Sequence, residues 1–298
     1  MSYVLQQGIQ KMRTEGVLET GLAGVRVLKR NIHRRLLSPR VIDDLGRSSN
    51  PYDRLVAAAL RDVLIDAPSK GEQIWIEAIE NRRHELKQST DAVTFTDYGV
   101  GPTQETYASD DVSRPVSEMA MGRRENVLLL FALIRRANPE TVIELGTSAG
   151  ISAAYQSVAL TLNDNGGELV TIEGAQPIGS TAQETFDHIG LECVSLVCGT
   201  FRKELPDVLD GTGEIDMIFI DGHHDEQATW DYFEMVAPHL SEDALVVFDD
   251  INWSAGMARV WDRLRSDNRL IPIVDTGQFG VCIAGDGAER TEATKVVL

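Results

Sequence analysis

The sequence predicts an α/β protein with a doubly wound, seven-stranded sheet that ends in an antiparallel pair of strands. From residue 141 onward, short apolar runs alternate with helix-like segments, which is the pattern of a parallel sheet with crossover helices. The last two runs, 270–275 and 280–284, are joined only by a short turn around Gly277, so they should pair antiparallel. The first strand leads into a glycine turn and a helix, the unit that opens such a sheet.

Apolar spacing and turn residues predict each element in order. The first helix after the N-terminal arm starts at Pro51, with Asn50 before it as a helix cap. The helices are 51–65, 69–87 and 116–137, and a short strand is predicted at 93–96. The helix over 69–87 has four apolar positions, Ile74, Ile76, Ile79 and Leu86. The seven strands are 141–145, 168–173, 193–199, 215–221, 244–250, 270–275 and 280–284.

Composition and charge divide the chain into three parts. Residues 1–47 are predicted to form a basic helical arm. Residues 48–115 are predicted to form a helical extension with a lid-like loop at 97–114, where glycine and proline residues indicate a loop. Residues 116–298 form the α/β domain. The arm carries nine Lys or Arg and four Asp or Glu, a net charge of +5, which leaves −23 for the rest.

The basic arm contains an amphipathic helix over 17–37. Its apolar positions are Leu18, Leu22, Val25, Leu28, Ile32 and Leu36. Such a helix lies on an anionic membrane surface, packs on its own domain, or packs on a second subunit of a homo-oligomer. The sequence leaves these three alternatives open.

Overall composition bounds the class of protein. The 298 residues carry a net charge of −18, which argues against nucleic-acid binding because that function needs a basic face. No apolar run is long enough for a transmembrane helix, and residues 1–16 lack the apolar core of a secretion signal. The three cysteines lie in strand-like runs and form no C-x-x-C pair, which is typical of free thiols in a cytoplasmic protein.

The turn in TVIELGTSAG, residues 141–150, is the first candidate ligand site. A dinucleotide fold requires G-x-G-x-x-G, whereas Ser148 here stands where the second glycine would approach a pyrophosphate. Glu144 at the strand end would also repel phosphates. A cationic ligand without phosphates, such as S-adenosylmethionine, therefore suits Glu144, Gly146, Ser148 and Gly150 better. The alternative is a turn that binds nothing.

Acidic residues follow four of the predicted strands, and ligands of such sheets gather at these carboxyl ends. They are Glu144, Glu173, Asp221 and the pair Asp249 and Asp250. Glu173 lies 23 residues beyond Gly150, close to the spacing at which an acidic residue binds both ribose hydroxyls. Because the strands that end at Asp221 and Asp249 should be neighbours, three carboxylates should meet there and attract a cation or a proton.

The motif ELGTSAG resembles motif I of the class I S-adenosylmethionine-dependent methyltransferases. The motifs DGHH and FDDINW resemble those of metal-dependent small-molecule O-methyltransferases, including the macrolide-sugar methyltransferases, and the resemblance covers about residues 92–285. It implies a Rossmann-like fold in which 116–298 bind S-adenosylmethionine. It also implies that Glu173 binds the ribose, that Gly146 and Gly150 approach the methionine part, and that Thr200 and Phe201 border the adenine.

The same resemblance suggests a metal-assisted reaction. Asp221, Asp249 and Asp250 would bind Mg²⁺ or another divalent cation. Asp221 is assigned to the cofactor site and to catalysis as well, and His224 to catalysis as the general base. The alternative for His224 is a structural or helix-capping histidine.

The predicted activity is methyl transfer from S-adenosylmethionine to a hydroxyl of a small molecule or sugar. Three alternatives remain from the sequence. One is a metal-independent N- or C-methyltransferase, and another is a non-catalytic Rossmann-like binding protein. The third is an NAD-dependent oxidoreductase, which the missing G-x-G-x-x-G argues against.

Overall fold

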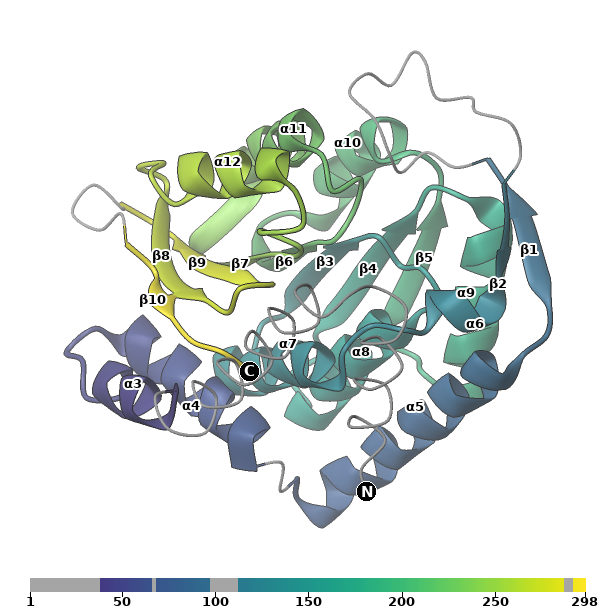
Figure 1. Cartoon of the computed structure of the whole chain (residues 1–298), viewed down its shortest axis with the longest axis horizontal. Helices are drawn as coiled ribbons and strands as arrows, with labels where there is room; N and C mark the ends of the chain where they lie inside the picture. Colours follow the sequence, from purple (N-terminus) through teal and green to yellow (C-terminus); the bar gives the residue numbers. More distant parts are fainter. Residues whose placement is uncertain (1–37, 66–67, 97–111, 287–291) are drawn as a thin grey trace, which may run out of the picture.

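The structure is a computed structural model that describes residues 38–65, 68–96, 112–286 and 292–298. A central sheet is covered by helices on both faces (Figure 1). Its strand order is β10-β8-β9-β7-β6-β3-β4-β5. The strands are β3 (Thr141–Leu145), β4 (Glu168–Glu173), β5 (Val194–Cys198), β6 (Ile215–Ile220), β7 (Leu240–Phe248), β8 (Leu270–Asp275), β9 (Gly280–Ala284) and β10 (Thr294–Lys295).

The seven predicted strands and the terminal hairpin are confirmed. Strand β9 runs antiparallel to both β7 and β8, and the other pairings are parallel. The predicted strand count was wrong by one, because β10 pairs with β8 at the sheet edge. A two-residue strand carries no periodicity that a sequence reading can detect. Ser38 secures this last segment, since its Oγ donates to the Val297 carbonyl and accepts from the Val297 amide, both at 3.1 Å.

Each face of the sheet has its own apolar core. One core lies under α10 (Phe201–Thr212), α11 (Glu226–Val236) and α12 (Ala255–Leu264). The other lies under α4 (Pro51–Ile65), α7 (Arg124–Ala137), α8 (Ile151–Asn163) and α9 (Gln176–Ile189). A 3₁₀ turn, η2 (Ala237–His239), leads into β7. The sheet is thus buried on both faces, which leaves the carboxyl ends of its strands as the place for a ligand.

The N-terminal extension adds short elements beside this sandwich. They are α3 (Ser38–Leu45), α4, α5 (Lys70–Gln88), β1 (Ala92–Phe95), β2 (Val112–Pro115) and α6 (Val116–Met119). The predicted helix starts are confirmed: Asn50 Oδ1 accepts from the Tyr52 amide, and Ser69 caps α5 through a capping box with Glu72. Strands β1 and β2 pair antiparallel.

Three sequence expectations in this extension were wrong. The predicted helix over 116–137 is interrupted between α6 and α7, where Arg83 of α5 donates hydrogen bonds to the carbonyls of Ala120 and Gly122. Ile74 was expected on an apolar face, but its side chain is 69% exposed. Residues 112–114 of the predicted loop belong to β2 instead, and residues 97–111 lie outside the described residues.

The predicted amphipathic helix, 17–37, also lies outside the described residues. The described part of the basic arm contains α3, which packs on α4. Among the helices that the structure describes, none is long and apolar enough to cross a membrane.

Candidate active site

The glycine turn after β3 has a backbone that its sequence explains. Gly146 has φ +101° and Gly150 has φ +79°, conformations that favour glycine. A Cβ atom on Gly146 would overlap the backbone carbonyl oxygen of Asp221, so only glycine fits between the ends of β3 and β6. The Asp221 amide donates to the Leu145 carbonyl at 2.9 Å and holds these two strand ends together.

A cavity of about 340 Å³ opens at the carboxyl ends of the central strands. It brings together seven of the predicted site residues: Gly146, Ser148, Glu173, Thr200, Phe201, Asp221 and His224. Glu173 ends β4, and the other six come from the turns that follow β3, β5 and β6 and from the start of α10. Residues that are up to 78 positions apart in the sequence therefore line one space.

Glu173 links two of these turns. Its Oε2 accepts from the Ser148 amide at 2.9 Å, and its Oε1 accepts from the Ala175 amide at 3.0 Å. Burial raises the pKa of this carboxyl, and the backbone amides that donate to it oppose that rise. A carboxylate held in this way presents fixed acceptor oxygens to a ligand in the cavity.

Glu144 and Gly150 do not line this cavity. Glu144 is fully buried, and its carboxylate accepts from Thr171 Oγ1 at 2.6 Å and from Gln156 Nε2 at 2.7 Å. Thr147 of the glycine turn lies 2.6 Å from Thr171, Oγ1 to Oγ1, so Glu144 supports the turn from below. Their predicted contact with a cofactor therefore stays a prediction.

Glu144 makes the stability of the fold depend on pH. Burial raises its pKa from 4.5 to about 7, so between these values the folded protein keeps a proton that the unfolded chain has lost. The free energy of unfolding should therefore fall as the pH rises from 5 to 8, by about 2–3 kcal/mol for this group alone. Glu144→Gln should remove this part of the pH dependence. The measurement is the free energy of unfolding, from denaturant titrations at pH 5 and pH 8. An unchanged slope would show that Glu144 is ionised in the fold throughout.

The three aspartates gather at the ends of β6 and β7. Asp221 and Asp249 share a side-chain hydrogen bond, and Asp249 Oδ1 also accepts from the Asp250 amide at 2.6 Å. Burial and mutual repulsion raise the pKa of Asp249 to about 7 and that of Asp221 well above its usual range. A proton held between the two carboxyls therefore relieves their repulsion in this arrangement.

Asp221 and Asp249 also line a second, smaller cavity of about 180 Å³, together with Gly146 and Ser148 of the turn. Asp250 lines neither cavity. Within the ranges that the structure describes, no group of three or more His, Cys, Asp or Glu side chains is placed to hold a metal ion. The predicted metal ligands are thus close in space without forming a metal-binding group.

The two neighbouring histidines have different surroundings. His224 lies between two carboxylates, with Nδ1 3.5 Å from Asp250 Oδ2 and Nε2 3.8 Å from Asp221 Oδ1. Burial lowers the pKa of His224, which favours the neutral ring at neutral pH, and Asp250 opposes this shift. His223 instead has its Nδ1 2.7 Å from the Tyr232 hydroxyl and packs its ring edge-on to Phe201. Both rings line the larger cavity, but only His224 lies between carboxylates, and its predicted catalytic role stays a prediction.

Sequence reasoning missed one wall of the larger cavity. Phe95, Thr96 and Arg114 line it from the β1–β2 hairpin, with the Arg114 guanidinium 5.8 Å from the Phe95 ring centre. The sequence predicted a short strand at 93–96. The residues around that strand do not indicate that it packs near the carboxyl ends of β3 to β6. Gln278, after β8, is a further missed residue, because its side chain donates to Asp249.

Comparison with known proteins identifies the domain. Residues 143–251 match the model of a methyltransferase domain family. This part of the chain is a methyltransferase domain. The match begins in β3 and ends just after Asp250, so it contains the glycine turn, Glu173 and the aspartates described above.

Individual relatives resemble parts of this chain. The O-methyltransferase hkm8 of Aspergillus hancockii is 29% identical over 132 residues, which cover 42% of this chain and 49% of the relative. The match thus spans about half the length of that curated relative. A methyltransferase of Podospora anserina with bound S-adenosylhomocysteine, PaMTH1, has a TM-score of 0.53 at 16% identity, covering 74% of this chain and 89% of that one.

An O-methyltransferase from Bacillus cereus in complex with S-adenosylhomocysteine gives a TM-score of 0.50 at 16% identity. That match covers 73% of this chain and 92% of that one. Both structures share the fold of the methyltransferase domain, so the predicted Rossmann-like architecture is confirmed.

Proposed function

We propose that this protein transfers the methyl group of S-adenosylmethionine to a hydroxyl of a small molecule. One observation carries the proposal: Glu173, the glycine turn and the His224 ring line the same cavity at the ends of β3, β4 and β6. A cofactor-binding carboxylate and a neutral base are thereby close enough to serve one reaction. The O-methyltransferase names of the relatives agree with this choice of acceptor atom.

The cofactor site follows from the chemistry of the lining. Glu173 would accept hydrogen bonds from both ribose hydroxyls, since a carboxylate offers two acceptor oxygens. The Phe201 ring and Thr200, at the start of α10, would border the adenine. Gly146 and Ser148 would lie beside the methionine part, where the absence of a Cβ at Gly146 allows close approach.

The transfer needs an aligned nucleophile and a proton acceptor. The hydroxyl oxygen of the acceptor attacks the methyl carbon, the carbon–sulfur bond breaks to give S-adenosylhomocysteine, and the hydroxyl proton passes to His224. Asp250 beside Nδ1 orients the ring and stabilises its charged form after proton transfer. The cavity supplies alignment by holding both substrates at the same strand ends.

The arrangement of the three aspartates does not fit a bound metal ion. Asp221 and Asp249 share a side-chain hydrogen bond, and Asp249 Oδ1 already accepts from the Asp250 amide. No step above is therefore routed through Mg²⁺. We expect turnover to persist in excess chelator, because His224 is neutral without a metal. Loss of turnover in chelator, with recovery on adding Mg²⁺, would show that the aspartates rearrange around a cation.

The function is tested by cofactor binding followed by an acceptor screen. Calorimetry should show binding of S-adenosylhomocysteine and no binding of NAD. Incubation with S-adenosylmethionine and a library of phenols, sugars, amines and carbon acids, read by mass spectrometry, then reports the methylated atom. Methylated amines or carbon acids in place of hydroxyl compounds would overturn the O-methyl assignment. Cofactor binding with no methylated product would favour the non-catalytic binding protein.

A further inference from the structure

The second cavity at the strand ends, of about 180 Å³, adjoins the larger one. The two cavities share Gly146, Ser148 and Asp221 in their linings, so they meet at the glycine turn. Asp221 Oδ1 lies 3.8 Å from Nε2 of His224, which lines the larger cavity. A molecule in the second cavity can therefore place one of its atoms beside the cofactor cavity and the His224 ring.

Most of the lining of the second cavity is apolar. Phe219 of β6 and Phe279, just before β9, are 1% and 2% exposed, and their ring centres lie 5.3 Å apart. Val127 and Leu130 of α7, both buried, also line the cavity. An engineered apolar cavity of about 150 Å³ holds benzene, so the second cavity has the size and the walls for one ring.

Asn126 of α7 is the polar exception in this lining. Its side chain is 5% exposed and has no hydrogen-bond partner within the part of the chain that the structure describes. The other uncharged polar side chains of the lining already bond within the protein, and they are Thr147, Ser148, Ser152 and Gln278. A buried carboxamide without a partner costs free energy, so a polar group of a ligand is its expected partner.

The charged side chains of the lining have partners in the protein. Arg83 Nη1 donates to Glu80 Oε1 at 3.1 Å, and Arg123 donates to the carbonyl of residue 298 at 2.9 Å. Asp221 and Asp249 share a side-chain hydrogen bond. The second cavity therefore favours a neutral ligand, because a charged one would lose its water without gaining an unpaired opposite charge.

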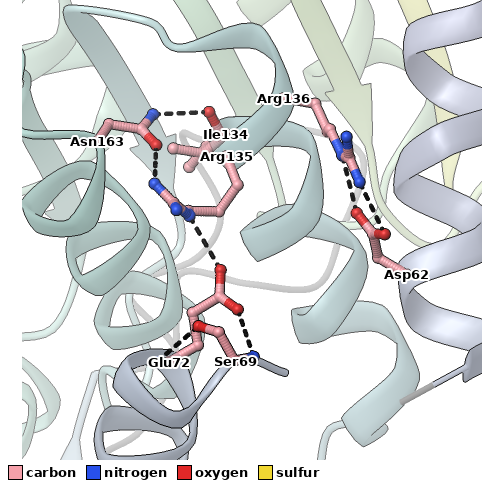
Figure 2. Close-up of polar contacts among 7 residues, drawn as sticks. All are labelled: Asp62, Ser69, Glu72, Ile134, Arg135, Arg136 and Asn163. Atoms are coloured by element: carbon pink, nitrogen blue, oxygen red, sulfur yellow. Dashed lines mark hydrogen bonds and ion pairs between the residues drawn. The ribbon is translucent and has the colours of Figure 1, made fainter. Parts of the chain in front are cut away.

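The helix that carries this carboxamide, α7, is fixed at its other end (Figure 2). Two consecutive arginines there point in opposite directions. Arg135 donates to Glu72 Oε1 of α5 at 3.2 Å and to Asn163 Oδ1 of α8. Arg136 donates to both carboxylate oxygens of Asp62, on α4, at 2.9 Å. These bonds tie α7 to three neighbouring helices, which limits movement of the cavity wall that it forms.

We propose that the second cavity binds the ring of a neutral, single-ring hydroxyl acceptor, and that Asn126 hydrogen-bonds to a polar substituent on that ring. The inference rests on the proposed function, with the cofactor in the larger cavity. A carboxamide substituent suits Asn126 best, because each amide then offers the other a donor and an acceptor. The hydroxyl of the acceptor lies where the two cavities meet, toward the methyl group and His224.

The test measures the binding of two matched probes to the full-length protein with bound S-adenosylhomocysteine. The hydroxybenzamides, with the amide at position 3 or 4, carry the polar substituent. The corresponding isopropylphenols replace it by an apolar group of the same shape. Calorimetry with the wild type should show about fivefold to tenfold tighter binding of one hydroxybenzamide than of its isopropyl counterpart.

Asn126→Leu keeps the shape of the side chain and removes its hydrogen bonds. It should abolish the preference for the hydroxybenzamide and leave the affinity for S-adenosylhomocysteine unchanged. Asn126→Asp keeps the size and removes the donor, so it should weaken hydroxybenzamide binding as well and serves if the leucine variant does not fold. Asn268→Leu is the matched control, because Asn268 is exposed and lies outside this lining, just before β8.

Equal affinities of the wild type for the two kinds of probe would overturn the proposal, and so would a preference that survives both Asn126 variants. Weaker S-adenosylhomocysteine binding in Asn126→Leu, with the probe preference intact, would overturn it in favour of the amino-acid part of the cofactor. Probe binding needs no turnover. A preference that is lost in Asn126→Leu therefore supports the site even where the acceptor screen yields no methylated hydroxyl, a result that counts against the proposed function alone.

Discussion

Glu173→Ala is expected to weaken S-adenosylhomocysteine binding by about 1–3 kcal/mol, which is roughly fivefold to 150-fold. The substitution leaves the ribose hydroxyls without an acceptor. It also frees the amides of Ser148 and Ala175, which Glu173 now holds at 2.9 and 3.0 Å. Isothermal titration calorimetry measures the loss directly and needs no methyl acceptor.

Glu168→Ala is the matched control, because Glu168 begins the same strand, β4, and is exposed at the other end of the sheet. Its affinity should equal that of the wild type. Equal affinity in Glu173→Ala would show that the cofactor ribose lies elsewhere. A melting temperature within a few degrees of the wild type excludes general unfolding as the cause of any loss.

His224→Ala is expected to lower turnover by about 10²- to 10⁴-fold while S-adenosylhomocysteine affinity stays near that of the wild type. The reason is that the ring supplies the proton acceptor and not a cofactor contact in the proposed site. Steady-state rates with an acceptor from the screen, together with calorimetry, separate the two effects. His188→Ala, which changes an exposed histidine on α9, is the control.

The pH profile gives a second readout for His224. A base must be neutral to accept a proton, and burial lowers the pKa of His224. The midpoint of the acid limb of the rate profile should therefore lie below pH 6.5, the ordinary pKa of histidine. His224→Ala should lose that limb. A limb that persists in the variant would assign the titration to another group, such as the pair of Asp221 and Asp249.

The order and type of the elements in the α/β domain were predictable from the sequence. Strands in a sheet covered on both faces read as apolar runs, and the glycine turn at 146–150 marks the strand-to-helix junction. The acidic ends of β4, β6 and β7 were predictable for the same reason, since parallel strands place their carboxyl ends at one edge. These predictions need only the local sequence of each strand and turn, together with the rule that parallel strands share one carboxyl edge.

Other features depend on contacts between distant segments. The break between α6 and α7 coincides with the hydrogen bonds of Arg83, which lies more than 35 residues earlier. The β1–β2 hairpin forms a cavity wall with no local signal that it does so. His223 and His224 have the same residue type and similar backbone conformations, with φ +63° and +40°. Their partners distinguish them: His223 contacts Tyr232 and Phe201, whereas His224 lies between Asp250 and Asp221.

Glu144 illustrates the difference between what the sequence determines and what only the tertiary structure determines. The sequence alone determined that an acidic residue stands at the end of the first strand, next to the glycine turn. Side chains alternate along a strand, so Glu144 shares a face with Val142 and points into the core under α8, while Leu145 packs in the other core. The packed helices decide which face is buried and how deeply, and this places Glu144 beneath the turn and Glu173 in the cavity.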